Sequence, residues 1–385
     1  MPIPHLPAEL LDHVVDHLRD TKDALSNCCL VSKSWIPRTR EHIFANVRFR
    51  TKEDLESWKE TFPNPSTSPA RYTKSLQIKC LPDITAADAE PGGWIRDFSH
   101  VVHFRFSEYD GRGVYLLPFH GFSSVLKSLR VEFYISPPTF DFILSFPLLE
   151  DLAVNFCMVE TYDGDGSDGL PTVIQPSDPP MFTGSLELVI TGLKPFIRQL
   201  LSLPGGIHFR KFAARWSYER DILPTTSLVG GCSHTLESLR ITREDFGASI
   251  RRLGLYRYLT LFPVGSAVLD LSRATKLQDV DFLSASLNIR WITAAIRTTT
   301  PKHRDLRKIS IHVPYSKTSF DTVKRSANYQ EWLDLDRLLV QIWESHSTSL
   351  RVICTTQLGQ PEGMIGLADC LLPELTRRGR VDSRG

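Results

Sequence analysis

The chain has 385 residues, of which 42% are hydrophobic and 23% are charged, and its formal net charge at pH 7 is +1. This length exceeds what one hydrophobic core usually holds, so we expect either two domains or one elongated array. A net charge so close to zero attracts the molecule neither to nucleic acid nor to anionic lipid, which argues against both as partners. No segment reaches the roughly 18 apolar residues that a membrane-spanning helix needs.

The cysteines and the first residues indicate a reduced intracellular setting. The seven cysteines contain no C-x-x-C pair, so neither a disulfide framework nor a zinc site is indicated; they are Cys28, Cys29, Cys80, Cys157, Cys232, Cys354 and Cys370. His5, Glu9 and Asp12 interrupt any apolar run that could serve as a secretory signal. We therefore expect a protein of the cytoplasm, the nucleus or both.

The N-terminal segment predicts three short helices. Pro7 and Glu9 suit the first turn of a helix whose apolar residues recur at helical spacing, namely Leu10, Leu11, Val14, Val15 and Leu18. A second helix is expected over residues 24–31. A third is expected over residues 35–43, with Pro37 in its opening turn.

A helix and a proline-rich stretch are expected to separate this unit from the rest of the chain. Residues 51–60 predict a charged helix, and three prolines in residues 62–69 prevent any helix from continuing. The expected organisation has four parts: an N-terminal unit over residues 1–50, a linker helix and boundary over 51–70, a repeat array over 71–373, and a flexible basic tail over 374–385.

Beyond the boundary, short strands of alternating polarity recur. Their first apolar residues are Leu76, Phe104, Leu129, Leu152, Leu186, Phe212, Leu239, Val280, Ile309 and Leu350. Six of the nine gaps between them fall between 23 and 29 residues, which is the period of leucine-rich repeats. Helical stretches are expected between strands, over residues 139–146, 196–203, 291–297 and 333–346. We expect an irregular α/β solenoid; a compact α/β domain with a parallel sheet is the rival.

Two glycine-rich patterns resemble ligand sites and are interpreted as ordinary surface. Residues 163–169 suggest a calcium loop or a dinucleotide fingerprint. However, the sixth and twelfth positions counted from Asp163 are Asp168 and Ile174, where an EF-hand needs Gly and Glu. Prolines leave no room for the helix that a dinucleotide site needs. Residues 230–234, which superficially resemble a nucleophile site, are interpreted as a turn before a strand.

The remaining candidates for chemistry are weak. His13 and His17 have metal-ligand spacing, but the sequence offers no third ligand, and we expect both to face solvent. Cys28 and Cys29 are interpreted as small hydrophobic residues. Of the five tryptophans Trp94, Trp216, Trp291, Trp332 and Trp343, most are expected to be core or capping residues. We find no catalytic constellation, so we expect no enzyme activity, no metal and no cofactor.

The N-terminal segment resembles the F-box of fungal F-box proteins, and the following repeats look like the leucine-rich arrays often attached to it. The resemblance covers about 45 residues and rests on Leu6, Pro7, Glu9, Leu10, Leu11, Val14, Leu18, Leu25, Cys28, Leu30, Val31, Ser32, Lys33 and Trp35. Arg40, Phe44, Val47 and Phe49 fit the pattern that trails this motif. The fold expected is therefore mixed α/β, with a three-helix F-box followed by an irregular leucine-rich-repeat-like α/β solenoid.

The resemblance implies a protein that joins partners. In the F-box family this unit binds a Skp-type adaptor of a cullin-RING ubiquitin ligase, and the repeats recruit a protein substrate. Carried over, the adaptor-binding residues would be Leu6, Pro7, Glu9, Leu10, Leu11, Val14, Leu18, Leu25, Cys28, Leu30, Val31 and Trp35. The alternative is a scaffold or binding protein, outside any ligase, whose F-box-like segment merely caps the repeat array.

Overall fold

A computed structural model describes most of the chain in two compact units, Met1–Met181 and Phe182–Gly385. The described residues are 7–79, 88, 90, 93–107, 119–133, 140–156, 180–189, 194–216, 221–243, 268–284, 289–313, 328–345, 351–356, 371–379 and 381–382. Residues 163–169, the first of the two glycine-rich patterns, lie outside this set.

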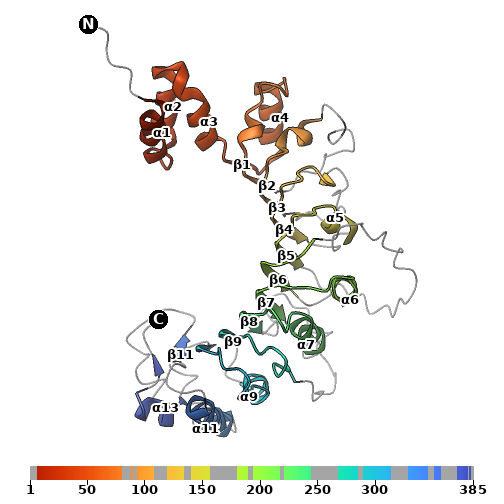
Figure 1. The fold of residues 1–385 in the computed structure, drawn as a ribbon, viewed down its shortest axis with the longest axis vertical. Helices are drawn as coiled ribbons and strands as arrows, with labels where there is room; N and C mark the ends of the chain where they lie inside the picture. Colours follow the sequence, from red (N-terminus) through yellow and green to blue (C-terminus); the bar gives the residue numbers. More distant parts are fainter. Residues whose placement is uncertain are drawn as a thin grey trace, which may run out of the picture. The chain divides into compact units, whose positions relative to one another are not determined.

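The first unit begins with the three helices that the sequence predicts (Figure 1). They are α1 (Ala8–His17), α2 (Lys22–Val31) and α3 (Ile36–Ile43), with a short 3-10 turn, η1 (Lys33–Trp35), between the last two. Both α1 and α2 pack against α3. Pro37 lies in the first turn of α3, where its missing N–H is not needed.

The rest of the first unit is a parallel sheet of five strands with helices between them. The strands are β1 (Asn46–Phe49), β2 (Ser75–Lys79), β3 (His103–Ser107), β4 (Ser128–Phe133) and β5 (Asp151–Phe156). The helical elements are α4 (Lys52–Thr61), η2 (Pro69–Tyr72), η4 (Trp94–Phe98) and α5 (Phe140–Leu144). Because β1 pairs with β2, the end of the expected N-terminal unit supplies the first strand of the repeat sheet.

The second unit repeats the same arrangement of parallel strands and helices. Its strands are β6 (Ser185–Val189), β7 (Lys211–Trp216), β8 (Ser238–Arg243), β9 (Asp279–Ser284), β10 (Lys308–Val313), β11 (Arg351–Thr356) and β12 (Val381–Asp382). Its helices are α6 (Lys194–Leu201), α7 (Ile222–Gly231), α9 (Arg290–Arg297), α11 (Asn328–Ser345) and α13 (Pro373–Arg377). The fold is mixed α/β with leucine-rich-repeat-like β-α units, as predicted.

Residues 374–379 and 381–382, part of the segment expected to form a flexible basic tail, are structured in α13, the turn after it and β12. Leu375 of α13 is fully buried. The buried carboxylate of Asp336 on α11 accepts hydrogen bonds from the backbone N–H groups of Glu374 and Leu375, at 2.7 and 3.1 Å. Beyond α13, β12 pairs with β11. Burial and this capping carboxylate therefore attach residues that the sequence alone presents as a basic tail.

Within each unit the strands follow the predicted alternation and pair in a constant register. In each of the nine strands from β2 to β10, the second residue is the first apolar residue that the sequence analysis assigns to that strand. In each, the side chains at alternate positions are buried, as for Leu76 and Ile78 in β2. At the entry to most strands, one carbonyl oxygen of the preceding repeat accepts bonds from two successive N–H groups; for example, Gln278 accepts from Arg307 and Lys308.

Polar side chains in the turns before several strands add further bonds between successive repeats. The Ser123 hydroxyl donates to the carbonyl oxygens of Ser99 and Val101. The Thr235 hydroxyl donates to the carbonyl of Phe209 at 3.1 Å. The fully buried His303 accepts at Nδ1 from the N–H of Thr300, at 3.0 Å, so its Nε2–H donates to the carbonyl of Leu271, at 2.9 Å. These bonds satisfy polar groups that would otherwise be buried without partners.

Candidate functional site

The first helix presents apolar side chains to solvent on one side while it packs on the other. Val15 is 1% exposed, whereas Leu10 and Val14, which lie four residues apart and so share a helix face, are 50% and 46% exposed. Leu11 and Leu18 are half-buried. The apolar stripe seen in the sequence is therefore only partly covered by the protein itself.

The second helix shows the same division. Leu25 and Cys28 are buried, but Leu30 and Val31 at its C-terminal end are 85% and 69% exposed. The η1 turn follows directly and packs against α1, which holds this end of α2 near the first helix. Four of the nine exposed large hydrophobic side chains among the described residues lie on these two short helices. We call Leu10, Val14, Leu30 and Val31 the apolar surface.

The residues that the resemblance assigns to adaptor binding thus fall into three groups. Exposed are Pro7, Glu9, Leu10, Val14, Leu30 and Val31; half-buried are Leu11, Leu18 and Trp35; buried are Leu25 and Cys28. Leu6 lies outside the described residues. The buried pair forms the interior of the three-helix unit, so a partner would contact the exposed group directly.

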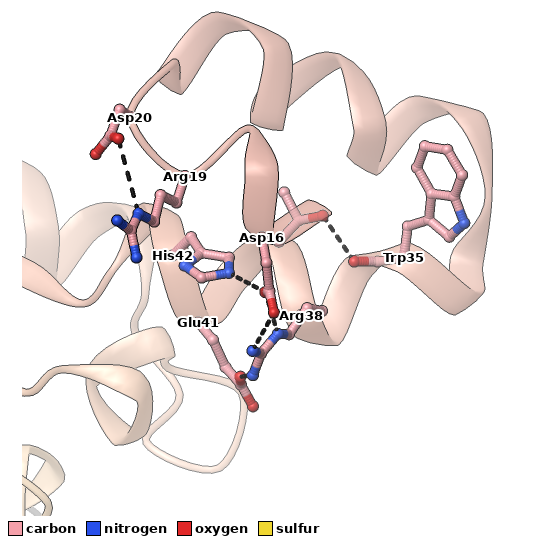
Figure 2. Close-up of polar contacts among 8 residues, drawn as sticks. Asp16, Arg19, Asp20, Trp35, Arg38, Glu41 and His42 are labelled. Carbon is pink, nitrogen blue, oxygen red and sulfur yellow. Dashed lines mark hydrogen bonds and ion pairs between the residues drawn. The ribbon is translucent and has the colours of Figure 1, made fainter. Parts of the chain in front are cut away.

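An ion-pair cluster that sequence spacing did not indicate joins α1 to α3 (Figure 2). Arg38 binds the Asp16 carboxylate with two N–H groups, at 2.7 and 2.8 Å, and His42 Nε2 lies 2.7 Å from the same carboxylate. Arg38 also donates to Glu41 at 2.7 Å. The hydrogen bonds from Arg38 and then from His42 hold the pKa of Asp16 far below its usual range.

This cluster fixes the orientation of α1, which carries Leu10 and Val14 of the apolar surface, against α3. The residues are separated by 22 and 26 positions in the chain, so no local pattern predicts their contact. In Figure 2 the side chains of Arg38 and His42 point toward Asp16, and the indole of Trp35 points away from the cluster. The backbone carbonyl of Trp35 accepts a bond from the buried Thr39 hydroxyl at 2.7 Å, which fixes the start of α3.

Aromatic side chains join the helical unit to the first strands of the sheet. Phe44, immediately after α3, packs edge-on against Trp58 and Phe62 of the following helix region, with ring centroids 6.0 and 5.8 Å apart. Phe49 on β1 packs on the same Trp58 and on Phe98. The turn η2 also contacts α3. The helical unit is therefore packed against the first repeats through α3 and Phe44.

The other sequence candidates do not assemble into a reactive site. His13 and His17 are both exposed, as expected, and no group of three or more His, Cys, Asp or Glu side chains within the described residues could hold a metal ion. Gly230 and Gly231 end α7, and Cys232 follows in the expected turn. Burial raises the pKa of the Cys232 thiol to about 12, so the thiol is protonated at neutral pH.

Several tryptophans belong to the core, as the sequence predicts. Trp94, Trp216, Trp291 and Trp332 are buried, and Trp343 is half-buried. Among the helices that the structure describes, none combines the length and the apolar character needed to cross a bilayer.

The chain matches no protein-family model and no curated protein.

Proposed function

We propose that this chain is the substrate-recognition subunit of a cullin-RING ubiquitin ligase, in which α1 to α3 bind a Skp-type adaptor and the repeats recruit a protein substrate. The observation that supports the proposal most is the apolar surface. Leu10, Val14, Leu30 and Val31 remain exposed on a unit whose interior is otherwise packed. Several exposed apolar side chains on one short helical unit are typical of a protein-binding site. Their positions coincide with the ordered set of residues that resembles an F-box.

The proposed role is non-catalytic. The chain would hold a bound substrate near the ubiquitin-charged enzyme and so raise its effective concentration. Such a role needs a firm connection between the two binding regions. The aromatic contacts of Phe44 and Phe49 with Trp58 provide one between the helices and the first strands.

The test is co-purification with a Skp-type adaptor, comparing two pairs of substitutions. The side chains of Leu10 and Leu30 are 50% and 85% exposed, so their burial against a partner would contribute about 2–4 kcal/mol. We expect Leu10→Glu with Leu30→Glu to weaken binding by roughly 30-fold or more, because that hydrophobic contribution is lost and a charge is buried.

The matched control places the same charges on exposed leucines elsewhere. Leu148 and Leu223 are 51% and 62% exposed and lie outside the three helices. Leu148→Glu with Leu223→Glu should leave adaptor binding unchanged. The proposal is wrong if the wild-type chain does not bind the adaptor, or if the two pairs of substitutions behave alike.

The alternative function, a binding protein whose helices only cap the repeats, is favoured by one observation. Phe44 and η2 tie α3 to the array, so the helices could serve mainly to cover its end. Deleting residues 1–43 removes only the three helices and keeps β1. Under the adaptor proposal the shortened chain stays folded and loses adaptor binding. Under the capping alternative it unfolds, and the full-length chain does not co-purify with the adaptor.

A further inference from the structure

Exposed basic side chains gather where three neighbouring strands of the second unit begin. Lys276 precedes β9, and Lys302, Arg304 and Arg307 precede β10, while Arg351 is the first residue of β11. All five are exposed. Because β9, β10 and β11 are adjacent and parallel, these residues lie at the same edge of the sheet. We call this set the basic edge.

Backbone bonds hold the loops of the basic edge side by side. The N–H of Arg307 donates to the carbonyl of Gln278 at 2.8 Å, and the N–H of Arg351 donates to the carbonyl of Arg307 at 2.8 Å. The buried imidazole of His303 ties the loop before β10 to Leu271 in the loop before β9, at 2.9 Å. The cations are thus carried on a scaffold whose polar groups are already bonded, so little ordering would be needed on binding.

The charges of the basic edge are not neutralised within the part of the chain that the structure describes. None of its five side chains forms an ion pair with another described residue. Nearby cations differ: Lys308 lies 3.9 Å from the Asp281 carboxylate, and Arg240 lies 3.1 Å from it. Asp305 is the one exposed acid among residues 301–307. An otherwise neutral chain therefore carries a local excess of positive charge here.

We propose that the basic edge binds an acidic polypeptide segment of the substrate, an inference that rests on the proposed function. Arginine guanidinium groups bind carboxylates with two parallel N–H bonds, and Arg304, Arg307 and Arg351 supply three of the five cations. The opposite charge of a segment rich in Asp and Glu complements this edge. The sheet edge also presents its cations in a row, which suits an extended chain.

A polypeptide fits this edge better than RNA. Single-stranded nucleic acid is held by aromatic side chains on which bases stack, together with a basic groove. Residues 272–278 and 301–307 contain no Phe, Tyr or Trp, and their imidazole, His303, is fully buried. The cations of this edge could contact phosphates, but residues 272–278 and 301–307 offer no exposed aromatic ring on which a base would stack.

The test measures binding of a fluorescent peptide of Glu and Ser to the full-length chain, with a Gln and Ser peptide of equal length as the control ligand. We expect Arg304→Glu with Arg307→Glu to weaken binding of the Glu peptide by about tenfold or more, because attraction becomes repulsion. Arg48→Glu with Arg198→Glu changes net charge equally at exposed residues that do not belong to the basic edge, and it should leave binding unchanged. Raising NaCl from ~0.05 to ~0.5 M should also weaken binding, because the Debye length shortens.

Three results would overturn the inference: equal binding of the two peptides, equal loss in the two double variants, or tighter binding of a uridine oligonucleotide at the same arginines. The assay contains no Skp-type adaptor, so its outcome is separate from that of the adaptor test. A chain that fails to bind the adaptor but binds the Glu peptide through Arg304 and Arg307 would refute the proposed function and keep this site.

Discussion

Phe49 offers the sharpest test of how the first strand holds the helical unit to the sheet. Its side chain is 2% exposed, and its ring lies 5.7, 5.6 and 6.1 Å from the rings of Trp58, Trp94 and Phe98. All three pairs are close to perpendicular, an arrangement that aromatic rings favour. Replacing Phe49 with Ala removes the shared member of these pairs and leaves a cavity between β1, α4 and η4.

The expected loss can be estimated from these contacts. Truncating a buried Phe to Ala usually lowers the free energy of unfolding by about 3–5 kcal/mol. The three ring pairs place Phe49 at the upper end, so we expect a loss of about 4–5 kcal/mol. Since whole domains are stable by only about 5–15 kcal/mol, this change removes a large share of the stability of the first repeats. Phe49→Leu keeps most of the volume and should cost less than half as much.

Amide hydrogen exchange followed by mass spectrometry can locate the effect. Phe49→Ala should reduce protection in β1, α4, η4 and α3, because Phe44 shares Trp58 with Phe49. The control is Phe209→Ala, a fully buried Phe in the second unit that packs on Phe182, and it should reduce protection there instead. The reasoning fails if Phe49→Ala leaves exchange around β1 at the wild-type rate, or if both variants lose protection in the same segments.

Three further predictions follow from buried or paired groups. Asp16→Asn should lower the melting temperature at pH 7. The pKa of Asp16 is lower in the folded protein than its unfolded value of about 3.9, so the ionised carboxylate stabilises the fold fully above that pH and loses this effect as the pH falls below it. The difference in melting temperature between the wild type and Asp16→Asn should therefore shrink in acid. A difference that stays constant with pH would contradict this. His303→Ala should lower the free energy of unfolding by about 2–4 kcal/mol, because the N–H of Thr300 and the carbonyl of Leu271 both lose their hydrogen-bond partner. A denaturant titration measures this loss, and a variant as stable as the wild type would refute the prediction. Cys232, whose pKa is raised to about 12, should resist iodoacetamide in the native protein at pH 8 and react once unfolded; rapid native labelling would show that it is accessible.

The strands could be predicted from the sequence, because each has a local signature. A strand such as β4 alternates polar and apolar residues, and its Leu129 and Val131 are both buried. Repetition of that pattern at a near-constant period then indicated the array. The alternation of Val47 and Phe49 was equally visible, but no local signal shows that β1 pairs with β2 and so belongs to the sheet.

Helix α7 shows where local signals fail. Its sequence, ILPTTSLVGG, includes one proline, two glycines and several β-branched residues, all of which disfavour a helix. The helix forms because it buries Ile222, Thr225, Leu228 and Val229. Gly231 also suits the close packing at the end of this helix, since a Cβ there would lie 2.9 Å from Leu201 Cδ2 and that side chain would have to shift. Tertiary burial overrides propensity in this segment.

The candidate site was predictable only as a set of residues. Helical spacing identified Leu10, Val14 and Val15 as one apolar stripe, but it could not show that Val15 is buried while the other two stay exposed. The contact of Asp16 with Arg38 depends on how α1 crosses α3, and that depends on packing of the whole unit. The basic edge likewise arises from three loops that only the sheet brings together.

The bonds at the strand entries give the array a direction of assembly. In those described above, the donor lies in the later repeat and the acceptor is a carbonyl of the earlier one, as for Ser123, Thr235 and His303. Loss of C-terminal repeats would leave carbonyl oxygens, which tolerate missing partners better than buried donors do. Loss of N-terminal repeats would leave the donor groups of the next repeat without acceptors. On the ribosome the N-terminal repeats emerge first, so each new repeat meets an acceptor that is already in place.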